Sequence, residues 1–150
     1  EIREIYEIRA ILETAAIRTA TPRLSEASLE QAAKILDAAE AATDGTTWGS
    51  LDVDFHQMIS DLEGRPRLHE LIVGLLRRVD RYWLSHGLLK HRGRFELEHR
   101  GLLAAIRFRD AEGAATLLER HLAGASEQLI SELDATLEPA AITRPKLATR

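Results

Sequence analysis

The chain has 150 residues, enough to bury one sizeable core, and its composition of 45% hydrophobic and 29% charged residues is that of an ordinary globular protein. It contains no cysteine, which excludes disulfides and thiolate metal sites and fits a reducing, cytoplasmic compartment. No apolar run approaches the roughly 20 residues needed to cross a membrane, and the net charge of −4 is a poor match for a nucleic-acid backbone.

Apolar residues recur at helical spacing along the chain, and no strand-like alternation persists. Aromatic residues make up only 5% of the sequence, which favours a core of Leu, Ile and Ala packed helix against helix. The short connections indicate an all-α, antiparallel bundle of six to seven helices. The expected helices cover residues 2–20, 26–42, 48–62, 67–89, 95–108 and 110–137.

The boundaries of these helices follow from residues that start or stop them. Pro22 ends the first helix, and Ser25 and Asp110 are placed to cap the second and the last. Gly64 and Pro66 separate the third helix from the fourth. The segments TDGTT (43–47) and KHRGR (90–94) are predicted to be a turn and a break between helices.

Two polar residues of the third helix, Asp52 and His56, are the first candidates for a binding site. They are four positions apart, so their side chains share one helix face and suit two ligands of one cation, or a simple Asp–His hydrogen bond. His99 and His121 each share an apolar stripe of a later helix. A histidine on such a stripe is either a core residue satisfied by a neighbour or a ligand.

Taken together, Asp52, His56, His99 and His121 come from three helices of one bundle, which is how bundle cores build metal sites. Three imidazoles and one carboxylate favour zinc or nickel, with manganese or iron as further candidates. The other histidines fall near helix ends or breaks and are predicted to be surface residues: His69, His86 and His91.

Three segments resemble the C-terminal effector domain, the FCD-type domain, of GntR-family bacterial transcription regulators of the FadR subfamily. They are the Asp-x-x-Phe-His segment at 52–56, Glu98-His99 followed by LLAAI, and LLERHL at 117–122. The opening IYEIRAILETAA is similar to the first helix of that domain, and the resemblance covers about residues 1–135. Gly64-Arg65 departs from the Gly-Asn that family members often carry.

The resemblance implies an effector-binding and dimerisation domain over residues 1–137, followed by a flexible basic tail over residues 138–150. The bundle would enclose one pocket, in which Asp52, His56, His99 and His121 hold the metal and a small organic acid binds beside it. A winged helix-turn-helix domain would precede residue 1, so operator DNA would be bound only by a part absent from this chain. Homodimerisation is also implied.

Three residues are candidates for binding the effector. Arg9 matches an arginine of the family pattern and could grip a carboxylate with two hydrogen bonds, or could instead form a surface ion pair with Glu13. Arg78 and Tyr82 lie near the middle of the fourth helix and could supply further contacts, although an aromatic residue there also suits ordinary packing.

The sequence therefore favours a ligand-sensing regulatory domain that is not an enzyme. Two alternatives remain open. A metal-dependent hydrolase or isomerase would need a general base, and none is evident, since Glu98 points about 100° away from His99 around its helix. A metal-free helical dimerisation module would use Asp52 only to pair with a histidine.

Overall fold

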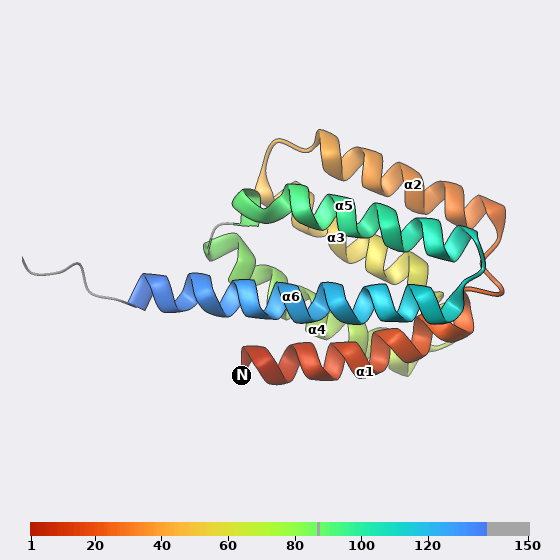
Figure 1. The fold of residues 1–150 in the computed structure, drawn as a ribbon, viewed down its shortest axis with the longest axis horizontal. Coiled ribbons are helices and arrows are strands. Elements are labelled where there is room, and N and C mark those ends of the chain that lie inside the picture. The colour runs from red at the N-terminus through yellow and green to blue at the C-terminus, as the bar shows by residue number, and fades with distance from the viewer. Residues whose placement is uncertain (87, 138–150) are drawn as a thin grey trace, which may run out of the picture.

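The computed structural model describes residues 1–86 and 88–137, and within these ranges the chain forms six α-helices and no strand. The predicted all-α bundle is therefore confirmed (Figure 1). In chain order the helices are α1 (Ile2–Ala20), α2 (Glu26–Ala41), α3 (Gly45–Ser60), α4 (Pro66–Ser85), α5 (Leu88–Arg107) and α6 (Ala111–Leu137). The predicted tail over residues 138–150 lies outside the described residues.

The helices α1 and α6 run antiparallel and side by side, and they form the most extensive helix pair of the bundle (Figure 1). α3 lies at the centre, because it contacts α1, α2, α4 and α5. From this position the His56 ring of α3 comes within 5.3 Å of the His99 ring of α5 and within 5.6 Å of the His121 ring of α6, measured between ring centroids. None of the helices within the described ranges is long and apolar enough to span a membrane.

Capping side chains set several boundaries as predicted. The Ser25 side chain accepts a hydrogen bond from the Ser28 backbone N–H, and Asp110 accepts one from that of Gly113. α3 begins three residues earlier than predicted, at Gly45. The reason is that Asp44 caps it by accepting a hydrogen bond of 2.8 Å from the Thr47 backbone N–H.

The predicted break at residues 90–94 is wrong, because these residues form the first turns of α5. Ion pairs one helical turn apart support the helix through this polar segment: Arg92 with Glu96 at 3.4 Å and Arg94 with Glu98 at 2.9 Å. The chain between α4 and α5 is accordingly shorter than expected, and α4 ends at Ser85 instead of continuing to residue 89.

The core is built from aliphatic side chains of all six helices around a few aromatic rings. Its largest fully buried apolar side chains are Phe55, Ile17, Leu29, Ile59, Ile72, Leu102, Ile106, Leu118, Leu122 and Leu129. Several polar or charged residues of the described ranges are buried as well, and those that carry an ionisable side chain are Arg9, Glu13, His56, His99 and His121. Because burying such groups without partners is costly, their contacts identify the candidate site.

Candidate metal and ligand site

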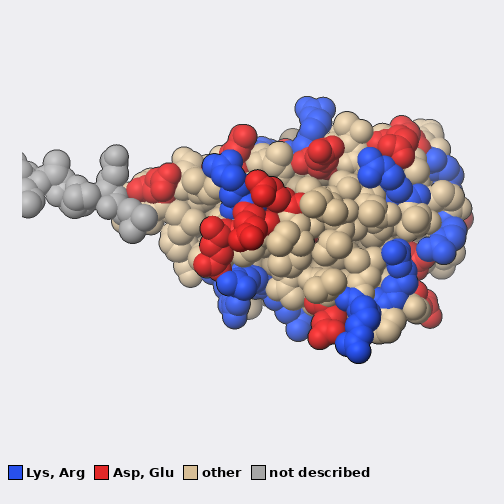
Figure 2. Space-filling model, turned by 90° about the horizontal axis from the view of Figure 1, so that it is seen from below, with Lys and Arg blue, Asp and Glu red and all other residues tan. Residues whose placement is uncertain are grey.

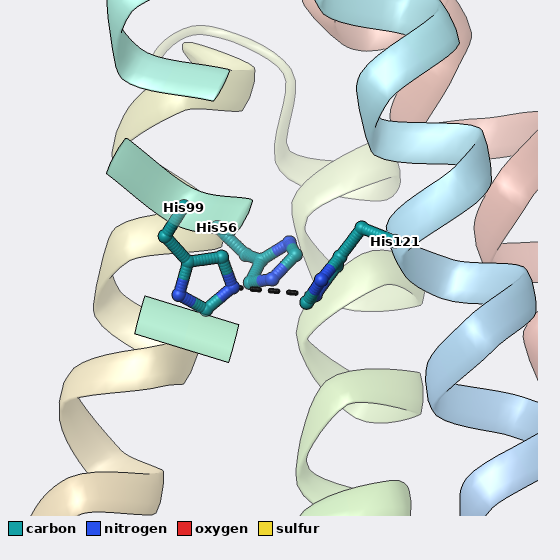
Figure 3. A group of neighbouring side chains, drawn as sticks. All are labelled: His56, His99 and His121. Atoms are coloured by element: carbon teal, nitrogen blue, oxygen red, sulfur yellow. Dashed lines mark hydrogen bonds between the residues drawn. The ribbon is translucent and has the colours of Figure 1, made fainter. Parts of the chain in front are cut away.

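The three predicted histidines converge inside the bundle (Figure 3). His56 comes from α3, His99 from α5 and His121 from α6, and each offers a ring nitrogen within 4.8 Å of those of the other two. The Nε2 atoms of His99 and His121 are 3.2 Å apart. All three residues are buried, with exposed fractions of 1%, 2% and 7% in chain order.

Asp52 lies next to this cluster, one helical turn before His56. Its Oδ1 atom is 3.4 Å from Nε2 of His99 and 4.0 Å from Nε2 of His56. The carboxylate is partly exposed, at 23%. The structure therefore brings the three histidines together and places Asp52, the fourth sequence-predicted ligand, beside two of them.

Two of these separations, 3.2 Å between His99 and His121 and 3.4 Å between Asp52 and His99, fit a single divalent ion. Two ligand atoms that are each about 2.1 Å from one ion lie about 3.0–3.4 Å apart when they subtend an angle between octahedral and tetrahedral values. The Nε2 atom of His56 is also buried without any hydrogen-bond partner, as judged over the described residues. An acceptor in that state costs free energy that a coordinated cation would offset.

Glu13 on α1 holds His56 in the orientation that leaves Nε2 free. Its Oε2 atom is 2.7 Å from Nδ1 of His56, and its Oε1 atom accepts a hydrogen bond of 2.7 Å from Nε of Arg9. Burial raises the pKa of Glu13, but its contacts with the Arg9 guanidinium and with His56 outweigh burial and lower that pKa to about 2. The carboxylate is therefore ionised, and Nδ1 of His56 carries the proton.

Glu98 orients the ring of His121 in the same way as Glu13 orients His56, since Oε2 of Glu98 is 2.7 Å from Nδ1 of His121. Burial lowers the pKa of His121, and burial together with the neighbouring histidines lowers the pKa of His99 well below its usual value. Both rings are accordingly neutral near pH 7, which is the form of imidazole that coordinates a metal. Carboxylates that orient ligating histidines in this way are typical of metal sites.

A small, partly open cavity of about 30 Å³ adjoins the cluster and is lined by residues of α1, α3, α4, α5 and α6. Arg9, Asp52, Asp80 and His121 supply its polar walls. The rest of the wall is largely apolar and aromatic: Tyr6, Trp48, Leu76, Val79, Trp83, Phe95 and Ala125. A volume of this size holds about one water molecule, so an organic acid requires some of these side chains to move.

The effector residues predicted from sequence divide into two groups. Arg9 lines the cavity, and its ion pair with Glu13 is buried instead of lying on the surface. Arg78 and Tyr82 are not brought to the cavity, because they contact Glu1 at a separate surface depression. On α4 the cavity is lined by Leu76, Val79, Asp80 and Trp83. Arg78 lies about 100° around the helix from Val79, and Tyr82 lies about 100° from Trp83.

The three remaining histidines lie outside the cluster, at positions that are exposed or half-buried. His69 is exposed and contacts Oε1 of Gln57, whereas His86 contacts the backbone carbonyl of Tyr82. His91 contacts Glu132 at 2.8 Å.

Sequence reasoning missed three acidic residues of the site, and the sequence does contain a signal for each. Glu13 and Asp80 occupy apolar stripes, Glu13 four residues before Ile17 and Asp80 four residues after Leu76. A charged residue on a core-facing stripe requires a partner. Glu98 has a weaker signal, since only its place beside His99 in the sequence marks it.

Comparison with known proteins places the chain among bacterial regulators. The FCD domain family matches residues 4–124. The transcriptional repressor NanR of Citrobacter rodentium (strain ICC168) is 26% identical over 130 residues, which cover 81% of this chain and 48% of that protein. NanR of Cronobacter sakazakii (strain ATCC BAA-894) matches with the same identity and coverage.

A solved structure shares the fold. The crystal structure of a GntR-family transcriptional regulator from Pseudomonas syringae pv. tomato str. DC3000 matches with a TM-score of 0.79 and 25% identity, over 90% of this chain and 57% of that one. The present chain thus spans about half the length of the relatives it matches.

Proposed function

The chain belongs to the FCD domain family, and from this premise we propose that it is the ligand-sensing domain of a GntR-type transcription regulator. The relatives that the chain matches are transcription regulators, and the domain is accordingly regulatory and not catalytic. Assignment to the FadR subfamily and a cytoplasmic location stay predictions. Operator DNA would be bound by a separate N-terminal domain.

We propose that Asp52, His56, His99 and His121 hold one divalent metal ion. The observation that carries this proposal is the buried, unpartnered Nε2 atom of His56, which faces two further imidazoles within 4.8 Å. The two carboxylates behind the ring nitrogens orient the ligands. The donor set favours zinc or nickel, with manganese or iron as further candidates. Such an ion would supply positive charge and open coordination positions for an anionic ligand.

The effector of this proposal is a small organic acid, which Arg9 would bind through its carboxylate. Among the described residues the Arg9 guanidinium is hydrogen-bonded through Nε alone, to Glu13, so its two terminal nitrogens remain for a ligand in the cavity. A bidentate bond to a carboxylate is the interaction that this geometry favours. The ion and Arg9 would then attract the anion from two sides.

The small cavity supports a sensing role. Because a volume of about 30 Å³ is too small for an organic acid, binding requires the surrounding helices or aromatic side chains to rearrange. An effector that prefers the rearranged state shifts the population of the domain toward it. In a homodimer such a shift would change the distance between the two DNA-binding domains.

Homodimerisation is also part of the proposal. Figure 2 views the face that carries α1 and shows a broad area without charged residues, flanked by acidic and basic side chains. Large apolar side chains are exposed on α1 and α4, among them Ile8, Ile11 and Leu71. Apolar surface of this kind is characteristic of protein–protein contacts.

Metal titration tests the central claim. Protein purified without an affinity tag and stripped with a chelator is titrated with zinc and nickel by calorimetry, as wild type, as His99→Ala and as His69→Ala. We expect wild type and His69→Ala to bind one ion per chain with equal affinity, and His99→Ala to bind at least about 100-fold more weakly. Absence of binding to wild type would favour the metal-free dimerisation module, and unchanged affinity in His99→Ala would overturn the ligand assignment.

A further inference from the structure

One acidic residue of the cavity is not used by the proposed metal site. Asp80 on α4 lines the cavity together with Arg9 and Asp52. Its carboxylate lies against Gly49 of α3, where a Cβ atom would overlap both Oδ1 and Cγ of Asp80. The absence of a side chain at position 49 therefore makes the room in which this carboxylate sits.

The carboxylate of Asp80 has no partner among the described residues. It is half-buried, and neither a hydrogen-bond donor nor a cationic side chain within the described ranges neutralises it. Among the described residues, the charged side chain that acts most on it is Asp52, which has the same sign. This contrasts with Glu13 and Glu98, each of which contacts both a histidine and an arginine. An unpaired carboxylate in a ligand cavity suits a hydrogen-bond donor from outside the chain.

Asp80 also changes the charge of the site. A divalent ion and Arg9 carry three positive charges, and Asp52 and Glu13 cancel two of them. Without Asp80 the cavity would keep one positive charge and would attract an anion, whether it carries one carboxylate or two. With Asp80 ionised the site is neutral once the metal is bound, and the negative charge is concentrated on the α4 side of the cavity.

We propose that Asp80 selects the effector, so that the site takes a monocarboxylic acid that bears an ammonium or hydroxyl group and discriminates against dicarboxylic acids. This inference rests on the proposed function, because it requires an organic acid to bind beside Arg9. The effector carboxylate lies toward Arg9 and the metal, and its donor group lies toward Asp80. A second carboxylate in that position meets like charge, which costs binding free energy.

Matched acids of graded length test the inference. Metal-loaded protein is titrated by calorimetry with ω-amino acids, ω-hydroxy acids and α,ω-dicarboxylic acids of three to six carbon atoms. The variants are wild type, Asp80→Asn and, as control, Glu70→Gln. Asn keeps the size of Asp80 and removes its charge, whereas Glu70 lies on the exposed surface of α4, where it pairs with Arg67.

We expect the tightest amino or hydroxy acid to bind wild type at least about ten-fold more tightly than the dicarboxylic acid of equal length. Asp80→Asn should reduce the preference for the amino acid over the dicarboxylic acid by a similar factor, and Glu70→Gln should leave it unchanged. Melting curves and metal titration verify that Asp80→Asn is folded and loaded. If Asp80→Asn fails to fold, the inference is judged on wild type alone, by its affinity for amino or hydroxy acids relative to dicarboxylic acids of equal length.

Two results overturn the inference, and they differ in what they imply. If a dicarboxylic acid binds wild type as tightly as its amino and hydroxy counterparts, or if Asp80→Asn keeps the preference, Asp80 does not select the ligand and the proposed function stands. If none of the acids binds metal-loaded protein, the acid-sensing role is contradicted and the inference fails with it.

Discussion

The carboxylate of Glu13 contacts Nδ1 of His56 at 2.7 Å, across the interface between α1 and α3. The same carboxylate accepts a hydrogen bond from Arg9, so a single buried anion connects the residue proposed to bind the effector with a residue proposed to bind the metal. Both carboxylate oxygens of Glu13 are occupied, one by Arg9 and one by His56. A substitution at Arg9 or His56 that shifts this carboxylate therefore also affects the other residue. This relationship gives the first prediction.

Replacing Glu13 with Gln should weaken zinc binding by about 10- to 100-fold, because the neutral amide holds His56 less firmly and makes Nε2 less basic. Calorimetric titration of stripped protein measures the affinity. The matched control is Glu4→Gln, an exposed position on the same helix. Wild-type affinity in Glu13→Gln would show that the contact with His56 serves packing and not metal binding.

Replacing Glu98 with Gln should have a smaller effect in the same assay. Glu98 orients His121 as Glu13 orients His56, but its side chain is 33% exposed, so water can replace part of the lost hydrogen bond. Glu13→Gln, measured in the same zinc titration, is the reference against which the loss in Glu98→Gln is compared. An equal or larger loss in Glu98→Gln would contradict the importance that we assign to burial.

Removing the metal should lower the melting temperature. An ion that binds only the folded state at 100 times its dissociation constant adds about 2.7 kcal/mol of stability. For a chain of this length that corresponds to a rise on the order of 5–10 °C. Differential scanning calorimetry with added zinc and with chelator measures the change, and His99→Ala serves as the insensitive control. Identical melting temperatures in zinc and in chelator would contradict a metal site in the folded domain.

Replacing Gly49 with Ala should destabilise the domain by about 1–3 kcal/mol, because the new methyl group overlaps the Asp80 carboxylate. Gly74→Ala on α4 is the control, since nothing lies within 4 Å of a Cβ there, and this substitution should stabilise the helix by about 0.5–1 kcal/mol. Urea unfolding measures both. Asp80→Ala should relieve the Gly49→Ala defect, and a defect that persists in the double variant would place its cause elsewhere.

Replacing Arg9 with Lys should weaken binding of the tightest acid in the matched series by about ten-fold or more, while zinc affinity changes little. Lys keeps the charge that balances Glu13 but cannot form a bidentate bond to a carboxylate. Titration with acid and with zinc separates the two effects. A loss of zinc affinity as large as the loss of acid affinity would indicate that Arg9 acts on the metal through Glu13 and not on the acid.

Periodicity and capping residues predicted most of the fold. Local signals placed the helix ends well where a cap was recognised, as at Ser25 and Asp110. The prediction failed at residues 90–94, because a polar segment with one glycine can be either a loop or a solvent-facing helix. Ion pairs one turn apart and packing against the bundle decide between these two outcomes.

The order of residues was enough to predict an all-α bundle and to place Asp52, His56, His99 and His121 on its helices, because helical spacing is a local property. The acidic residues that contact the histidines could be identified only from the packing of the helices. This packing placed Glu13 and Asp80 at the site and left Arg78 and Tyr82 on the surface. The physical reason is that such contacts depend on the rotation and register of each helix against its neighbours, which a pattern along one chain does not specify.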